Sequence, residues 1–172
     1  MTRIEWNDFL SVGHAKIDED HKHLLEILNR LADSEERRKR DVVAKAVNDM
    51  AAYASEHFAR EEELMKAINY PLLAEHTERH KELTAKVAAW QRKLTGRWHP
   101  WHGGTFFAVL AHWLVSHILD DDRLVADFRR TGRVGHRFRK QAAGKEPFPA
   151  LRPAPGKGLD PTRGPRPRRV AA

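Results

Sequence analysis

The chain of 172 residues contains no cysteine, which excludes disulfide bonds, thiolate nucleophiles and thiolate metal ligands. Any metal site must therefore use imidazole and carboxylate groups, a ligand set suited to iron, zinc, copper or nickel. Long apolar runs are also missing, because the longest, from Phe106 to Val115, is broken by His112 and is too short to span a bilayer. The first residues lack the apolar segment of a secretory signal, so the expected location is the cytoplasm.

Acidic side chains are scarce in the last quarter of the chain. Residues 129–172 hold 13 Lys or Arg against 2 Asp or Glu, whereas residues 1–128 hold 18 against 22. Seven of the nine prolines lie in residues 141–172, where little apolar content is available to offset the entropy of ordering. The sequence therefore predicts a folded domain over residues 1–130 and a basic, disordered tail rich in Pro, Gly and Arg over residues 131–172.

The basic tail has two interpretations. Its positive charge could bind nucleic acid or an anionic membrane surface, since either partner attracts clustered arginines. No motif in the tail supports the recognition of bases, however, so a solubilising extension is the favoured interpretation.

Four segments carry hydrophobic residues at the spacing of an α-helix, and none shows the alternation of a strand. Asp18 or Asp20 is expected to cap the first helix, which ends before a charged turn. The remaining helices are expected over about residues 41–68, 72–94 and 105–129.

Helix terminators separate these segments. Pro71 disfavours helical geometry in the residue before it, and Gly96 follows the third helix as glycine often follows a helix C-terminus. Short connections between helices of similar length predict an all-α fold, an up-down-up-down four-helix bundle. Residues 1–17 are expected to form an N-terminal arm whose apolar side chains lie across the bundle.

Histidine and acidic side chains recur at positions from which helices could direct them to one point. His57 and Glu61 are four residues apart, as are His76 and His80, so each pair lies on one face of its helix. Each pair alone is explained as well by solvated polar groups, and His21 or His117 alone by a hydrogen-bonded core histidine. Five buried histidines together would all need polar partners, and metal coordination would provide them at once.

The spacing of these residues follows one pattern, in which x is any residue. It reads Ile17-Asp-Glu-Asp-His21, Tyr53-x-x-x-His57-Phe-x-x-Glu61-Glu-x-Leu-Met65, Tyr70-Pro71, His76-x-x-x-His80 and Trp113-Leu-x-x-His117-Ile-x-x-x-Asp122. This pattern resembles the hemerythrins, specifically the bacterial hemerythrin domains, over roughly residues 4–127.

The resemblance implies a cofactor of two non-haem irons, bridged by an oxo or hydroxo group and by two carboxylates. One iron would be bound by His76, His80 and His117, and the other by His21 and His57. Glu61 and Asp122 would bridge the two irons. The iron with two histidines would keep an open position for oxygen, beside an apolar wall formed by Trp113, Leu114 and Ile118.

The bridging aspartate is the one ligand that simple helix geometry does not select. Asp121 lies four residues after His117 and would share its face on a regular α-helix, whereas Asp122 lies five residues after it. The resemblance favours Asp122, and a local π-type widening of the helix would reconcile the two. Asp122 is therefore the predicted ligand, with Asp121 as the alternative.

The ligand set favours reversible binding of dioxygen over enzymatic chemistry. Ferritin-like di-iron bundles use four carboxylates and two histidines, whereas this chain offers five histidines and two carboxylates. Fewer anionic ligands stabilise the ferric state less, and an apolar pocket without an acid limits cleavage of the O–O bond, which needs protons. The predicted function is oxygen carriage, storage, delivery or sensing, and the protein is not expected to be an enzyme.

Two alternatives remain open at this point. The same centre could act as a redox enzyme on peroxide or nitric oxide. The domain could also serve as a sensor or interaction module that acts through its basic tail and an unknown protein partner, because the chain contains no output domain.

Overall fold

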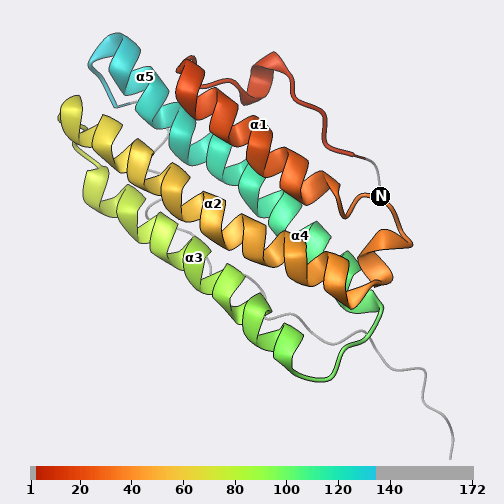
Figure 1. Ribbon diagram of the computed structural model, residues 1–172. Coiled ribbons are helices and arrows are strands. Elements are labelled where there is room, and N and C mark those ends of the chain that lie inside the picture. The colour runs from red at the N-terminus through yellow and green to blue at the C-terminus, as the bar shows by residue number, and fades with distance from the viewer. Residues whose placement is uncertain (1–2, 135–172) are drawn as a thin grey trace, which may run out of the picture. The chain divides into compact units, whose positions relative to one another are not determined.

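The computed structural model describes residues 3–134, and all regular structure among them is helical. Four long rods lie side by side as a bundle (Figure 1). The fourth rod is a continuous run of α4, a π-helical segment and α5. The elements are η1 (Asp8–Leu10), α1 (Ala15–Asn29), η2 (Glu36–Arg38), α2 (Arg40–Ala67), α3 (Leu73–Thr95), α4 (Trp101–Ser116), η3 (His117–Asp122) and α5 (Arg123–Thr131).

The predicted all-α four-helix bundle is therefore confirmed. Its interior is filled by the apolar faces of the helices, with Leu24, Leu28, Val47 and Leu110 each at most 1% exposed. Burying such side chains contributes about 1.5–3 kcal/mol each to folding. Among residues 3–134, no helix is both long and apolar enough to cross a membrane.

The N-terminal arm is attached along the bundle by backbone contacts. The Asn29 side chain accepts a hydrogen bond from the Ile4 amide at 2.9 Å and donates one to the Ile4 carbonyl at 2.8 Å. Arg123 donates to the carbonyl of Phe9 at 3.0 Å. The arm buries Leu10, but the Phe9 side chain is 78% exposed, so not all of its apolar residues pack as expected.

The start of α1 corrects the sequence prediction. The helix begins at Ala15, and His14 caps it by accepting a hydrogen bond from the Ile17 amide at 3.4 Å. Asp18 and Asp20 both lie inside the helix. Asp18 instead holds the arm, because its carboxylate accepts hydrogen bonds from the Ser11 hydroxyl and the Val12 amide, both at 2.7 Å.

The start of α4 also differs from the prediction, which placed it near Thr105. The helix begins at Trp101 and includes Gly103, a residue type that normally weakens a helix interior. A Cβ atom on Gly103 would lie 1.8 Å from the Arg37 carbonyl oxygen and 2.9 Å from a methyl group of Val43. The glycine is therefore needed for the close approach of α4 to the α1–α2 connection.

Substituting Gly103 with alanine should destabilise the protein. The added methyl group must displace backbone at Arg37, and we expect a loss of about 2–4 kcal/mol in the free energy of unfolding. Gly104→Ala is the matched control, because its Cβ would meet only the Arg37 side chain at 3.8 Å and alanine favours helix. Chemical denaturation of both variants measures the difference; equal stabilities would contradict the prediction.

The predicted basic tail lies almost entirely outside the described residues. Within them, α5 continues to Thr131, and Gly132 follows it in the left-handed conformation that commonly ends a helix.

Candidate metal centre

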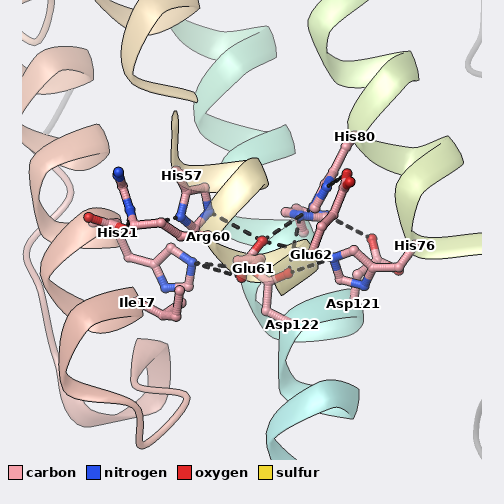
Figure 2. Close-up of polar contacts among 12 residues, drawn as sticks. Ile17, His21, His57, Arg60, Glu61, Glu62, His76, His80, Asp121 and Asp122 are labelled. Atoms are coloured by element: carbon pink, nitrogen blue, oxygen red, sulfur yellow. Dashed lines mark hydrogen bonds and ion pairs between the residues drawn. The ribbon is translucent and has the colours of Figure 1, made fainter. Parts of the chain in front are cut away.

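Seven histidine and acidic side chains from all four rods converge in the interior of the bundle. All of them are buried. Figure 2 shows Glu61 and Asp122 in the middle of the group, with His21 and His57 on one side and His76 and His80 on the other. The complete set is His21 from α1, His57 and Glu61 from α2, His76 and His80 from α3, and His117 and Asp122 from η3. The structure thus brings together every residue predicted as a ligand.

The carboxylates of Glu61 and Asp122 lie at the centre of this cluster and contact its histidines. Glu61 lies 3.4 Å from the Nε2 atom of His57 and 3.2 Å from that of His80. Asp122 extends its two oxygens in opposite directions. Its Oδ2 atom lies 3.2 Å from His21 Nε2, and its Oδ1 atom lies 3.3 Å from His76 Nε2 and 3.1 Å from His117 Nε2.

Although these polar atoms lie close together, many of them have no hydrogen-bond partner. Among residues 3–134, ten buried side-chain nitrogen and oxygen atoms lack a hydrogen-bond partner, and all ten belong to the seven cluster residues. Orphaned polar groups in a protein interior are costly and rare. Eight of the ten atoms, the five Nε2 nitrogens and three carboxylate oxygens, point at shared space between them, as ligands of a cation do; the other two are the far nitrogens, Nδ1, of His21 and His57.

The ligand atoms form two overlapping groups, each within 4.8 Å. One group contains His76, His80 and His117, the other contains His21 and His57, and both contain Glu61 and Asp122. Seven donors exceed the four that a structural zinc ion takes. The arrangement fits two cations that share the carboxylates.

The π-helical segment explains how Asp122 enters the cluster. Residues His117–Asp122 form the wide turn that the spacing of the sequence required. Asp122 is consequently 1% exposed and faces the Nε2 atom of His117. Asp121, the alternative candidate, contacts the other ring nitrogen, Nδ1, at 3.1 Å.

Outer carboxylates orient several of the cluster histidines. Glu62 lies 3.1 Å from Nδ1 of His80, as Asp121 does from Nδ1 of His117. Asp20 lies 3.6 Å from Nδ1 of His57. A carboxylate on the far nitrogen fixes the ring and makes the near nitrogen a stronger metal ligand.

Asp20 is the functional residue that the sequence did not reveal. It is fully buried, and it accepts hydrogen bonds from the Tyr53 hydroxyl at 2.9 Å and from Nε of Arg60 at 2.7 Å. Burial alone would raise the pKa of Asp20, but its contacts with His57, Arg60 and Tyr53 lower it well below the usual range. Asp20 is thus a fixed negative charge behind His57. Its only signal in the sequence is that it directly precedes His21.

The acidic groups also favour positive charge on His117 and His21. Burial would lower the pKa of His117, but the charge of Asp122, the hydrogen bond to Asp121 and the charge of Glu61 raise it to about 9. The pKa of His21 is raised for similar reasons, because Asp122 and Glu61 outweigh its burial. The negative charges of Asp122 and Glu61 would likewise stabilise a metal cation bound at these nitrogens.

The predicted apolar wall adjoins a cavity. Trp113 and Leu114 line a mostly apolar cavity of about 70 Å³ that reaches His117, whereas Ile118 packs in the core and does not line it. Leu24 and Phe58, each near a cluster histidine in sequence, line the same cavity. On the outer side, its walls include the small residues of α2 and α3: Ala51, Ala54, Thr84 and Ala88.

Known proteins are similar to this chain in sequence and in fold. Residues 12–128 match the family model for the hemerythrin HHE cation binding domain. Bacteriohemerythrin of Stenotrophomonas maltophilia is 31% identical over 127 residues, which cover 74% of this chain and 82% of that protein. Myohemerythrin of Riftia pachyptila is 27% identical over 113 residues, which cover 66% and 82% of the two chains.

A solved structure of wild-type hemerythrin has the same fold. It superposes with a TM-score of 0.64 at 23% identity, covering 73% of this chain and 97% of that one. The family match spans the whole described bundle from the end of the N-terminal arm to α5, and it includes all seven converging side chains. The chain belongs to the hemerythrin family.

Proposed function

We propose that this protein binds dioxygen reversibly at a centre of two non-haem irons. His76, His80 and His117 would hold one iron, His21 and His57 the other, and Glu61 and Asp122 would bridge them. The seven converging ligand residues in two overlapping groups, whose facing atoms lack hydrogen-bond partners, are the observation that carries this proposal. When bound, the irons supply the redox chemistry on which reversible oxygen binding depends.

The residues around the centre support binding rather than turnover. The cavity that reaches His117 has no carboxylate, lysine or arginine in its lining. Besides His117, the polar residues of this lining are Thr84, whose hydroxyl donates to the His80 carbonyl at 2.9 Å, and Gln91, whose amide nitrogen donates to the Asn48 side chain at 3.0 Å. With the Nε2 atom of His117 bound to iron, the cavity would offer no carboxylic acid or ammonium group to assist cleavage of the O–O bond. The protein is accordingly proposed to be a binding protein and not an enzyme.

The biological role that follows is oxygen carriage, storage, delivery or sensing, and the proposed compartment is the cytoplasm. The five imidazoles and two carboxylates leave less negative charge at the irons than a ferritin-like set of four carboxylates does. This charge balance supports the return of oxygen to solution after binding.

Metal analysis combined with optical spectroscopy tests the proposal. The purified full-length chain is expected to contain about two irons and to show a visible band that appears with oxygen and disappears under argon over repeated cycles. One zinc per chain would overturn the assignment of the metal. Rapid consumption of peroxide or nitric oxide, without a stable oxygenated form, would replace oxygen binding with redox catalysis.

Narrowing the cavity should slow oxygen binding. Ala88 on α3 lines the cavity, so Ala88→Phe would fill much of its outer part, and we expect the association rate to fall about tenfold. Ala85→Phe is the matched control, because Ala85 is exposed on the same helix and does not line the cavity. Flash photolysis or stopped-flow mixing gives both rates, with iron content checked in each variant. An unchanged rate in Ala88→Phe would mean that oxygen enters elsewhere.

A further inference from the structure

One end of the bundle exposes tryptophan on a basic surface. We call it the tryptophan end, and it comprises the α3–α4 connection (residues 96–100) with the adjoining ends of α3 and α4 and the α1–α2 connection. Figure 1 shows the two connections at the same end of the bundle. Trp101 is 62% exposed there, although large aromatic side chains are usually buried.

The rings at this end are held in place. The Trp98 indole donates to the Arg38 carbonyl at 3.2 Å, which ties the α3–α4 connection to the α1–α2 connection. The Trp101 ring lies 4.2 Å from the His102 ring and stacks at 6.2 Å on His99. Since Trp101 is already ordered, a partner that buries it loses little side-chain entropy on binding.

The two histidines at this end are not a second metal site. The Nδ1 atom of His102 accepts a hydrogen bond from the His99 amide at 3.1 Å. The neutral ring must then carry its proton on Nε2, so neither nitrogen has a free lone pair for a metal. The rings serve as packing for Trp101.

The charge at this end has the opposite sign to the rest of the domain. Residues 83–119 contain no Asp or Glu at all. Residues 29–41 and 90–102, which form the tryptophan end, hold 8 Lys or Arg against 4 Asp or Glu. Residues 1–128 as a whole carry a formal balance of −4, so positive charge is concentrated where Trp101 is exposed.

Several of these cations are available to a partner. Arg92, Lys93 and Arg97 are exposed beside the α3–α4 connection. Two others have structural roles, because Arg37 donates to the Ala32 carbonyl and Arg40 to the Leu94 carbonyl. These three exposed cations and the exposed indole therefore lie at the same end of the bundle.

We propose that the tryptophan end docks on the anionic surface of a lipid bilayer. Indole rings favour the membrane interface, where an apolar body and a polar N–H are both accommodated, and basic residues are attracted to anionic headgroups. A single-stranded nucleic acid would stack successive bases on several aromatic rings, whereas Trp101 is the only exposed tryptophan or phenylalanine among residues 29–41 and 90–102. The proposal concerns the folded domain and is independent of the metal centre.

Vesicle sedimentation of the full-length, metal-loaded chain tests this docking. Binding is expected to vesicles of equal parts phosphatidylcholine and phosphatidylglycerol, not to phosphatidylcholine alone, and to weaken with salt. Trp101→Ser and the double variant Arg92→Glu with Arg97→Glu should each lower the apparent affinity about tenfold or more. Phe9→Ser is the control for the loss of an exposed apolar side chain. The double variant Arg130→Glu with Arg133→Glu is the control for a change of charge at the far end of the domain. Both controls should bind the vesicles like the unaltered chain.

Three results would overturn the proposal. Equal binding by all variants would show that the tryptophan end is not the docking surface. A loss confined to the Arg130 and Arg133 variant would assign binding to the C-terminal part of the chain. Binding to a single-stranded oligonucleotide in place of anionic vesicles would identify a nucleic acid as the partner.

Discussion

Glu61→Gln should abolish the metal centre while leaving the bundle folded. Glutamine keeps the shape of glutamate but removes the charge that faces His57 and His80 at 3.4 and 3.2 Å. One of the two carboxylates shared by both ligand groups is then lost, so both cations lose a ligand. We expect iron to fall from about two to fewer than about one per chain, and the oxygen-dependent visible band to disappear.

Glu63→Gln is the matched control for this substitution. Glu63 lies two residues further along α2 and is exposed, so its loss removes the same charge without touching the cluster. Iron content by elemental analysis and helix content by circular dichroism should be measured for both variants. Full iron loading of Glu61→Gln would contradict the assigned bridge.

Removing the metal should lower the thermal stability of the protein strongly. Eight of the ten orphaned atoms face the space between the ligands and would gain a partner from a cation there, so the metal-free domain must bury these polar groups without partners. A metal that binds the folded and not the unfolded chain adds its binding free energy to stability. We expect a decrease in the melting temperature of about 10 °C or more after chelation.

Calorimetry of the loaded, chelated and iron-reconstituted protein measures this effect. The melting temperature should recover with ferrous iron under argon, and recovery should fail in Glu61→Gln. Equal melting temperatures for the loaded and chelated protein would mean that the cluster is satisfied without a cation.

Much of this structure could be predicted from residue spacing. The interval of four residues in His57–Glu61 and His76–His80 is the repeat of a helix face, so periodicity alone places each pair on one face of its helix, and the resemblance to the hemerythrins implies that the faces meet. The interval of five between His117 and Asp122 is not a helical repeat, and the structure meets it with a π-turn. Because the rest of this helix repeats regularly, an interval of five residues between two expected ligands indicates a local departure from α-helical geometry.

Contacts between distant segments could not be predicted in this way. Position 103 in α4 needs glycine because the carbonyl of Arg37, far away in sequence, comes so close that no Cβ fits. The sequence predicts Asp20 as a possible helix cap, because acidic residues are common at that position. Its hydrogen-bond partners, Tyr53 and Arg60, instead lie on another helix. Such features depend on how helices pack, which hydrophobic spacing alone does not specify.

The contacts made after the π-turn also make the length of α4 critical. Deleting one residue from α4 would rotate everything after it by about 100°. Val125 would then leave its place against Met65 and Tyr70, and Arg123 and Arg129 would no longer reach the carbonyls of the N-terminal arm. Deletions that surface loops absorb without harm should therefore be excluded from α4, whereas losing one of the three consecutive aspartates would remove only the extra residue that the π-turn accommodates.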